Sequence, residues 1–271
     1  MTSARWLVAL DIDGTVLHED GTLADVVREQ VQRASALGHE VMLATGRSAA
    51  MTLPVLDRLG ITPTYLVCSN GAITLKRDPD APAGYSRHFV ETFNPSEVLT
   101  TIRSNLDAAH YAVEDETGLY RFTGYFPDGT LGASSVKVKF DELLEHHATR
   151  VVVISPEHDI EDFLSVVERM GLHKVSYNVG WTAWLDIAPD GVNKSTALER
   201  VRALLDIPRS RVMVVGDGRN DIEMLEWASA EGRAVAMGQA PAEVVAAANE
   251  TTSTDLDEGV ARVLESLTRR D

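Results

Sequence analysis

The sequence predicts an α/β protein, a doubly wound parallel sheet into which a second, α+β module is inserted. In the first and last parts of the chain, short apolar runs alternate with segments of helical spacing, a pattern typical of parallel strands covered by helices on both faces. Two Pro/Gly-containing stretches, at residues 78–84 and 189–191, interrupt that alternation. With 271 residues, the chain also exceeds the usual size of one domain.

The first part of the chain alternates predicted strands with predicted helices. Each strand is an unbroken apolar run, and the first helix is followed by Gly38, a common helix stop. The predicted strands cover residues 5–10, 41–44 and 65–68, and the predicted helices cover residues 25–37 and 49–59. This order predicts that the strands lie parallel in one sheet.

The middle of the chain, residues 82–188, has a different character and predicts an inserted α+β module with a partly antiparallel sheet. Its predicted elements are helices at residues 95–109 and 159–170, strands at 119–126, 135–140 and 151–154, and a hairpin at 175–187 that turns at Gly180. Trp181 and Trp184 lie three positions apart on this hairpin, hence on opposite faces of a regular strand. We expect one of them in the core and the other at the cleft.

The α/β alternation resumes after the second interruption. Its predicted elements are helices at residues 194–205 and 221–228 and strands at 212–215 and 233–236, with further helices beyond. Residues 1–81 and 189–271 are therefore expected to form one core domain, and residues 82–188 the module inserted into it. A cleft between two such units is the usual place for a ligand.

Composition excludes several classes of protein. Acidic residues outnumber basic ones by 41 to 25, and the formal charge of −16 repels nucleic acid and anionic membrane surfaces. The single cysteine, Cys68, excludes an intrachain disulfide and a four-cysteine zinc site. The apolar run at residues 6–10 is too short for a signal sequence or a membrane span. We expect a cytoplasmic protein that binds neither nucleic acid nor membranes; its oligomeric state stays open, a monomer included.

Polar residues follow the apolar runs where the predicted strands end. Because ligands of open α/β sheets bind beyond the carboxyl ends of the strands, these residues are the first candidates for a site. Together with the lysine that opens the helix after the insertion, they are Asp11, Asp13, Thr45, Gly46, Arg47, Ser69, Asn70, Gly71, Asp217, Asn220, Asp221 and Lys194.

Carboxylates that share one site repel one another unless a cation lies among them. Mg²⁺ resolves this conflict, and it also neutralises the oxygens of a phosphoryl group. The candidate metal-binding residues are Asp11, Asp13, Asp217 and Asp221. The hydroxyl of Thr45, backbone amides near Gly46 and the ammonium of Lys194 would then bind the phosphate oxygens.

These motifs, in this order, resemble the haloacid dehalogenase superfamily, and in particular its Cof-like phosphatases, class IIB proteins with a C2-type cap inserted between the second and third motifs. The resemblance covers essentially the whole chain and implies a Rossmann-like core with a cap that selects the substrate. The segments that carry it are Asp11-Ile12-Asp13-Gly14-Thr15, Thr45-Gly46-Arg47, Lys194 and Gly216-Asp217-Gly218-Arg219-Asn220-Asp221.

The resemblance implies a catalytic pair and a metal site. By this resemblance, Asp11 is the nucleophile that forms an aspartyl-phosphate, and Asp13 is the acid that protonates the leaving group and later activates water. Asp217 is a direct ligand of Mg²⁺, and Asp221 supports the metal directly or through water. The backbone carbonyl of Asp13 can also reach the metal.

The remaining motif residues are implied to bind the substrate. Thr45 and Lys194 resemble the residues that hold the transferring phosphoryl group. Gly46 and Arg47 adjoin Thr45, and Asn220 resembles a position that hydrogen-bonds near the metal and the phosphate.

Several of these residues have a purely structural alternative. Thr45 precedes a predicted helix and could cap its first turn. Asn70 before a glycine is typical of a turn, and Arg47 is as compatible with a surface position as with a substrate contact. Arg219 stands where many relatives carry an acidic or small residue, and we expect its side chain to point to solvent.

The leading functional hypothesis is a phosphatase that acts on a small phosphorylated metabolite, such as a sugar phosphate. A phosphotransferase or phosphomutase of the same superfamily is an alternative, and only the fate of the phosphoryl group separates the two. A receiver-like signalling protein shares an acceptor aspartate, further acids, a threonine and a lysine, but would be close to one ordinary domain in size. A non-catalytic sensor of phosphorylated ligands would be expected to lack Asp11 or Asp13, and both are present.

Overall fold

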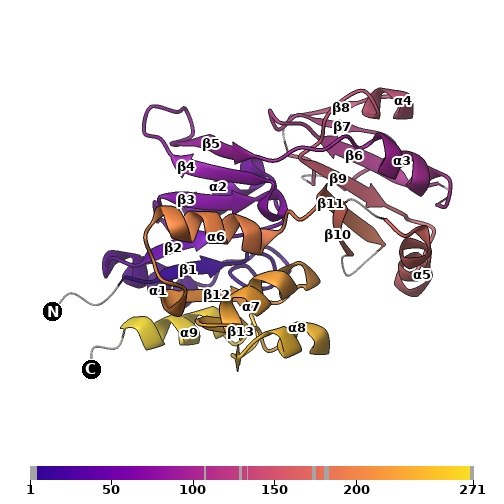
Figure 1. The fold of residues 1–271 in the computed structure, drawn as a ribbon. Helices are drawn as coiled ribbons and strands as arrows, with labels where there is room; N and C mark the ends of the chain where they lie inside the picture. The colour runs from indigo at the N-terminus through magenta and orange to yellow at the C-terminus, as the bar shows by residue number, and fades with distance from the viewer. Residues whose placement is uncertain are drawn as a thin grey trace.

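The computed structural model describes residues 5–106, 108–127, 130–132, 134–172, 175–179 and 183–268. Figure 1 shows two bodies, a core built from both ends of the chain and a second sheet built from its middle. Within the described residues, no helix combines the length and the apolar character that crossing a bilayer requires.

The core is a parallel sheet to which both ends of the chain contribute. Its strand order is β14-β13-β12-β1-β2, and all neighbouring strands run parallel. The strands are β1 (Leu7–Leu10), β2 (Glu40–Leu43), β12 (Val212–Gly216), β13 (Arg233–Ala236) and β14 (Glu250–Thr251). β1 lies between β2, which precedes the insertion in the chain, and β12, which follows it. The two parts of the chain therefore form one sheet. The predicted α/β core is confirmed.

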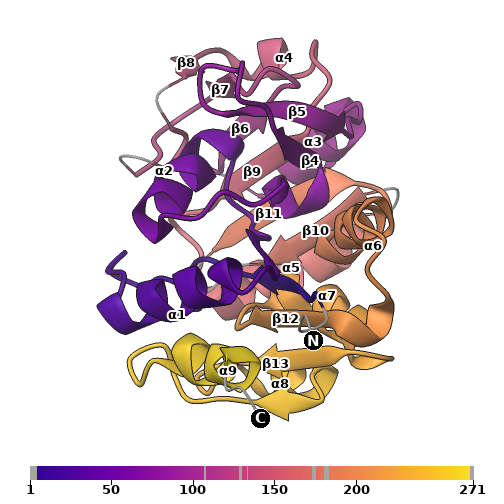
Figure 2. The same ribbon diagram turned by 90° about the vertical axis from the view of Figure 1, so that its left-hand side faces the viewer.

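Helices cover both faces of this sheet, and Figure 2 shows α1 and α9 side by side on one of them. Side chains of β1 alternate between two hydrophobic clusters, with Val8 and Leu10 in one and Leu7 and Ala9 in the other. The helices of the first cluster are α1 (Asp25–Ala36), α2 (Ala49–Leu59) and α9 (Gly259–Thr268), and those of the second are α6 (Lys194–Leu204), α7 (Ile222–Ser229) and α8 (Ala242–Ala247). Burial on both faces explains why the strands are apolar throughout.

A three-stranded antiparallel sheet extends the core towards the insertion. Its order is β3-β4-β5, with strands β3 (Tyr65–Cys68), β4 (Ile73–Arg77) and β5 (Tyr85–Val90). A bridge from Val67 to Ala44 attaches β3 to the end of β2. The boundary expected at residue 81 falls between β4 and β5, although β5 pairs with β4. We therefore propose that the inserted module begins after Val90 and ends with β11 at Pro189, one residue after the predicted end at residue 188.

The inserted module is a six-stranded sheet with helices on one face. Its order is β10-β11-β9-β6-β7-β8, antiparallel except between β7 and β8. The strands are β6 (His110–Glu114), β7 (Tyr120–Phe122), β8 (Ser135–Lys137), β9 (Arg150–Ile154), β10 (Val175–Val179) and β11 (Trp184–Pro189), and the helices are α3 (Ser96–Arg103), α4 (Phe140–Leu143) and α5 (Ile160–Met170). Side chains of these helices join the hydrophobic cluster on one face. The other face carries Trp184 beside Val152 and Phe126.

The structure corrects several predicted elements of the module. The helix expected at residues 95–109 ends at Arg103, and β6 follows at His110, where no strand was predicted. The strand expected at residues 135–140 ends at Lys137, because Phe140 begins the short helix α4. The hairpin expected at residues 175–187 forms between β10 and β11. Its turn at Gly180 lies outside the described residues, as does Trp181.

Candidate active site

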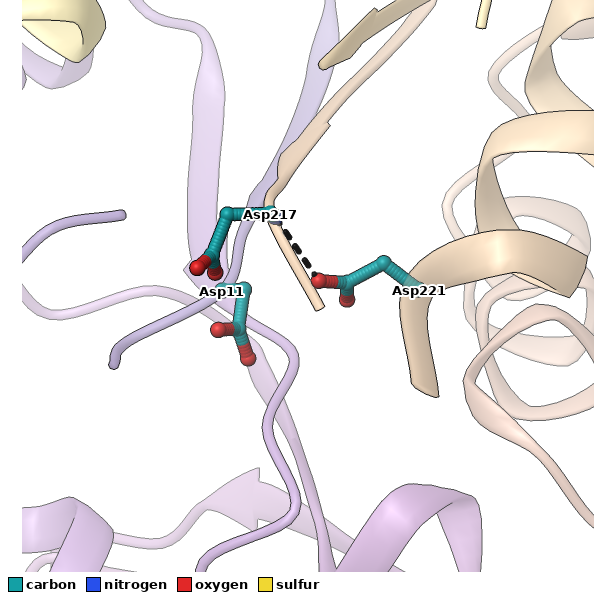
Figure 3. A group of neighbouring side chains, drawn as sticks. All are labelled: Asp11, Asp217 and Asp221. Atoms are coloured by element: carbon teal, nitrogen blue, oxygen red, sulfur yellow. Dashed lines mark hydrogen bonds between the residues drawn. The ribbon is translucent and has the colours of Figure 1, made fainter. Parts of the chain in front are cut away.

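Two aspartates stand side by side where adjacent parallel strands end. Asp11 follows β1 and Asp217 follows β12, and these strands are neighbours in the sheet. Together with Asp221, they present carboxylate oxygens that all lie within 4.8 Å of one another. Figure 3 shows the three side chains meeting between their loops. All three residues are buried. The structure thus brings together three of the four acids that were predicted to bind a metal.

The loop after Asp11 passes close to Asp217. Gly14 has a φ of +68°, and a Cβ at this position would lie 2.3 Å from Oδ2 of Asp217, so the loop requires glycine. Thr15 donates its hydroxyl to Oδ1 of Asp217 at 3.2 Å. Gln239 holds the same loop by donating from Nε2 to the carbonyl oxygen of Gly14 at 2.5 Å. The motif glycine and threonine therefore set the distance between the two strand-end aspartates.

Asp221 closes the turn that follows Asp217. Its Oδ2 accepts hydrogen bonds from the backbone amides of Asp217 and Gly218, each at 3.0 Å. A Cβ at Gly216 would lie 2.4 Å from the same oxygen. The four-residue spacing between the two acids therefore folds the loop back on itself and places both carboxylates near Asp11.

Lys194 brings a positive charge to these acids. It is the first residue of α6 and is fully buried. Its Nζ donates to Oδ1 of Asp11 at 2.6 Å and to Oδ1 of Asp221 at 2.7 Å. Burial opposes its charge, but the carboxylates of Asp11 and Asp221 outweigh burial and raise the pKa of Lys194 above its ordinary value. These contacts explain a lysine at a helix start, where the helix dipole disfavours a cation.

The backbone that carries Lys194 is held by the helix cap and by a close glycine contact. Asn193 caps α6, accepting a hydrogen bond at Oδ1 from the amide of Thr196 at 3.0 Å. Gly71 has a φ of +101°, and a Cβ there would lie 2.2 Å from the carbonyl oxygen of Asn193. The turn after β3 therefore packs directly on the residue before the lysine.

Gly71→Ala is expected to lower the free energy of unfolding by about 2–3 kcal/mol, because the new methyl group meets a backbone carbonyl and the backbone conformation disfavours a Cβ. It should also lower kcat by roughly tenfold or more, since Lys194 shifts with Asn193. Thermal melts and phosphate-release kinetics measure the two effects.

Gly84→Ala is the matched control. Gly84 has a φ of +71° with open space around the position of a Cβ, so this change should produce the backbone strain alone, about 1 kcal/mol. Equal loss of stability in the two variants would show that the contact with Asn193 has no role.

The electrostatics of the acids fit a divalent cation. Burial raises the pKa of Asp11 well above its usual range; Lys194 opposes this, while Asp221 and Asp217 add to it. Burial, followed by the neighbouring Asp221, raises the pKa of Asp217 to about 7. These carboxylates resist ionising together, and a coordinated cation would reverse that preference. A donor set of carboxylate oxygens suits a hard cation such as Mg²⁺.

The fourth predicted acid, Asp13, points elsewhere. Arg47 donates from Nε to Oδ2 of Asp13 at 2.9 Å and from Nη2 to Oδ1 at 2.5 Å. The Asp13 side chain is 61% exposed, and its carboxylate is not in the group formed by the three other acids. Arg47 is therefore neither a free surface residue nor, in this arrangement, a free substrate ligand. A metal contact through the Asp13 backbone carbonyl stays a prediction.

Thr45 is buried at the end of β2 and does not cap α2, whose N-cap residue is Ser48. Its Oγ1 accepts a hydrogen bond from the backbone amide of Arg47 at 3.1 Å, which orders the turn into the helix. The helix-cap alternative for Thr45 is therefore wrong, and its side chain lines the same cavity as Asp11.

Asn70 acts as a turn residue and also contacts the site. It has a left-handed backbone with a φ of +51°, as expected before a glycine in a turn. Its Oδ1 accepts a hydrogen bond from Nδ2 of Asn220 at 3.1 Å, and a Cβ at Gly46 would lie 3.1 Å from that oxygen. The structure thus brings Gly46, Asn70 and Asn220 together.

Two other predictions concern Arg219 and Cys68. Arg219 borders the cavity and donates from Nε to Oε1 of Glu243 at 2.9 Å. Its side chain therefore does not simply point to solvent, as was expected. Cys68 is fully buried, and burial raises the pKa of its thiol to about 12. It is a packed thiol, as expected, and not a nucleophile.

A cavity of about 350 Å³ lies above the acids, between the core and the inserted module. Its core wall includes the predicted residues Asp11, Asp13, Thr45, Gly46, Arg47, Asp217 and Asn220. Lys194 and Asp221 are buried beneath it. The inserted module contributes the residues Thr130, Arg150, Trp184 and Asp186. A pocket of this size suits a small molecule.

Sequence reasoning anticipated a cleft position for one of the hairpin tryptophans, and Trp184 occupies it, but it missed Arg150 and Asp186. A signal existed for each of the missed residues. Asp186 is a lone carboxylate within an otherwise apolar strand, two positions after Trp184 and so on the same face, and Arg150 directly precedes an apolar run.

The sequence matches a known family over nearly its whole length, from residue 8 to residue 264; the family is described as haloacid dehalogenase-like hydrolase. Among curated proteins, the 5-amino-6-(5-phospho-D-ribitylamino)uracil phosphatase YitU of Bacillus subtilis (strain 168) is 28% identical over 274 residues, which span 97% of this chain and 98% of that protein. The HMP-PP phosphatase of Yersinia pseudotuberculosis serotype O:1b is 25% identical over 244 residues, 86% of this chain and 84% of that protein.

Solved structures share the whole architecture. The HAD subclass IIB sugar phosphatase BT4131 superposes with a TM-score of 0.80 at 20% sequence identity, covering 96% of this chain and 98% of that one. At this identity the likeness establishes the fold alone, a parallel core with an inserted module.

Proposed function

The chain belongs to the haloacid dehalogenase-like hydrolase family, and from that membership we propose that it is a Mg²⁺-dependent phosphatase with Asp11 as its nucleophile. The observation that carries the proposal is the position of Asp11. It follows β1, which has a parallel neighbour on each side, and it lies beneath a cavity, with Lys194 at 2.6 Å and the carboxylates of Asp217 and Asp221 beside it.

The proposed reaction has two displacements at phosphorus. In the first, a carboxylate oxygen of Asp11 forms a bond to phosphorus while the bond from phosphorus to the ester oxygen breaks, and Asp13 gives its proton to the departing alkoxide. In the second, Asp13 takes a proton from a water molecule whose oxygen bonds to phosphorus. The bond from phosphorus to Asp11 then breaks, releasing inorganic phosphate.

The contact between Asp13 and Arg47 adds a condition to this scheme. While both oxygens of Asp13 accept from Arg47, its carboxylate has no proton to deliver. A phosphoryl group in the cavity would offer the guanidinium an alternative bidentate partner. We propose that Arg47 moves from Asp13 to the phosphate when the substrate binds, which frees Asp13 to act as the acid.

Mg²⁺ would be held by Asp11, Asp217 and Asp221, with the backbone carbonyl of Asp13 as a further ligand. Bound there, it would neutralise charge on the phosphoryl oxygens. Lys194 pairs with Asp11 and Asp221 and would contact the phosphoryl group, with Thr45 and the amides near Gly46 on the other side of that group. The hydrogen bond from Asn220 to Asn70 would hold the side chain of Asn220 in place beside the phosphoryl group.

The substrate proposed is a small phosphorylated metabolite. Two supports are the cavity of about 350 Å³ and the activities named for the relatives YitU and the HMP-PP phosphatase, which act on small phosphorylated compounds. Phosphoryl transfer to a second hydroxyl would use the same residues, so it is retained as the alternative. A receiver-like or purely sensory role gives no reason for a nucleophile and an acid two residues apart beneath a substrate-sized cavity.

A test compares the two products of the reaction. Purified protein with Mg²⁺ is incubated with a panel of sugar, nucleotide and cofactor phosphates, and inorganic phosphate and free alcohol are both quantified. Hydrolysis yields them in equal amounts. A deficit of inorganic phosphate, with the missing phosphoryl groups on a second alcohol, would identify a phosphotransferase. Release of neither product across the panel would contradict the proposal.

A further inference from the structure

The inserted module contains a buried charged network that the proposed chemistry does not use. Arg150 is 7% exposed and Glu114 is 1% exposed. Arg150 donates from Nη1 to the hydroxyl of Tyr120 at 3.2 Å, and Tyr120 donates to Oε2 of Glu114 at 3.1 Å. The same Oε2 accepts from the hydroxyl of Ser69, in the core, at 2.9 Å. The network thus runs from the core, through the module, to the cavity wall.

At the cavity end, the network fixes one carboxylate. Arg150 donates from Nε to Oδ1 of Asp186 at 2.6 Å, and Trp184 donates from its indole nitrogen to Oδ2 at 3.0 Å. Burial opposes the charge of Arg150, and Asp186 is the neighbour that does most to hold the pKa of that guanidinium above its ordinary value. The Asp186 side chain is 18% exposed and borders the cavity.

A gain in folding stability does not account for burying these charges. A buried ion pair is often no more stable than apolar residues of similar volume, and described side chains on the helix-covered face of this sheet form an apolar cluster. The network does, however, give Asp186 a single orientation. Each carboxylate oxygen can accept two hydrogen bonds, so Asp186 keeps accepting capacity after its bonds to Arg150 and Trp184.

The charges around the cavity indicate what this carboxylate would accept. Arginines at the cavity are engaged by acids: Arg47 by Asp13, Arg150 by Asp186 and Arg219 by Glu243. On the module side of the cavity, the positive charge of Arg150 and the negative charge of Asp186 cancel. Among the described residues that line the cavity, no added cation would offset the repulsion between Asp186 and a second phosphate or a carboxylate on the leaving group, whereas a hydroxyl would donate to Asp186.

We propose that Asp186, oriented by Arg150 and Trp184, accepts hydrogen bonds from hydroxyl groups of the leaving group and so selects phosphomonoesters of uncharged, hydroxyl-rich alcohols. This inference rests on the proposed phosphatase function. Asp186 is then a specificity-determining residue, and Arg150 and Trp184 are positioning residues.

Three phosphate esters with six-carbon chains test it. Sorbitol 6-phosphate is rich in hydroxyls, n-hexyl phosphate has none, and 6-phosphogluconate adds a carboxylate. For the wild-type protein, kcat/KM should be highest for sorbitol 6-phosphate, roughly tenfold or more above the other two. Asp186→Asn should lower kcat/KM for sorbitol 6-phosphate about 10- to 100-fold and leave n-hexyl phosphate within about threefold.

Asp115→Asn is the matched control, because Asp115 forms a comparable ion pair with Arg121 in the same module at 2.7 Å without bordering the cavity. It should leave the ranking of the three esters unchanged. If Asp186→Asn melts below the assay temperature, Trp184→Phe replaces it, since this change removes the indole donor, keeps an aromatic ring beside Phe126 and leaves Asp186 paired with Arg150. Trp184→Phe should lower kcat/KM for sorbitol 6-phosphate about three- to tenfold, with n-hexyl phosphate again unaffected.

The outcomes separate the two proposals. Phosphate release from none of the three esters or the wider panel would contradict the phosphatase function itself. A phosphatase that hydrolyses n-hexyl phosphate or 6-phosphogluconate as efficiently as sorbitol 6-phosphate would overturn the selectivity alone. An equal loss with sorbitol 6-phosphate and n-hexyl phosphate on changing Asp186 would show a structural role.

Discussion

Replacing Asp11 by asparagine is expected to lower kcat by roughly four orders of magnitude or more, because an amide oxygen does not form the covalent intermediate. The fold should persist. Asparagine has nearly the same volume, and the change removes one of the crowded carboxylates while Lys194 keeps Asp221 as a partner at 2.7 Å. Phosphate release under single-turnover conditions and thermal melts give the two measurements.

Asp25→Asn is the control for this variant. Asp25 lies in the first turn of α1 with its side chain 79% exposed, and it neither belongs to the acid cluster nor borders the cavity, so its loss should leave turnover unchanged. If Asp11→Asn retained phosphate release within tenfold of the wild-type rate, Asp11 would not be the nucleophile.

Removal of divalent cations by EDTA is expected to lower activity by roughly 100-fold or more, and added Mg²⁺ should restore it, because several kcal/mol of charge stabilisation are lost with the metal. Binding should also be visible without turnover. Mg²⁺ binds only the folded site, so it should raise the melting temperature of the wild-type protein in proportion to the logarithm of its concentration.

Asp217→Asn provides the comparison, since Asp217 is one of the three acids grouped within 4.8 Å. This variant should show a much smaller rise in melting temperature with Mg²⁺. Full activity in EDTA, together with no effect of Mg²⁺ on the wild-type melt, would remove the metal from the proposed mechanism.

The core was predictable because its local and global signals agree. Strand β1 is apolar throughout, since Val8 and Leu7 enter hydrophobic clusters on opposite faces of the sheet. The inserted module was harder, because its sheet is covered by helices on one face only and its strands carry polar residues whose partners are distant. Strand β6 was missed for this reason: Glu114 at its end is buried by contacts with Ser69 and Tyr120, which the local sequence does not reveal.

The site residues likewise fall into those that the sequence predicts and those that it does not. Asp11, Thr45 and Asp217 could be predicted because the carboxyl ends of parallel strands meet at one edge of a sheet, whatever else the chain does. Asp186 stands out in the sequence as a carboxylate in an apolar strand, but its position at the site depends on how the module docks against the core. The contact between Asp13 and Arg47 was equally out of reach, since it depends on the turn that Thr45 orders.

The close packing of Gly71 on Asn193 has a consequence for how this protein could diversify. This contact holds the backbone before Lys194 against the turn after β3. The position of the lysine is therefore set by the core, although only a short segment separates it from the inserted module. The chain passes from the core to the module after Val90 and returns at Pro189. Asp11 precedes the first of these junctions, and Lys194, Asp217 and Asp221 follow the second. We therefore propose that a different module could be inserted between the same two junctions, which would change the pocket for the leaving group and leave the residues of the phosphoryl chemistry unaltered.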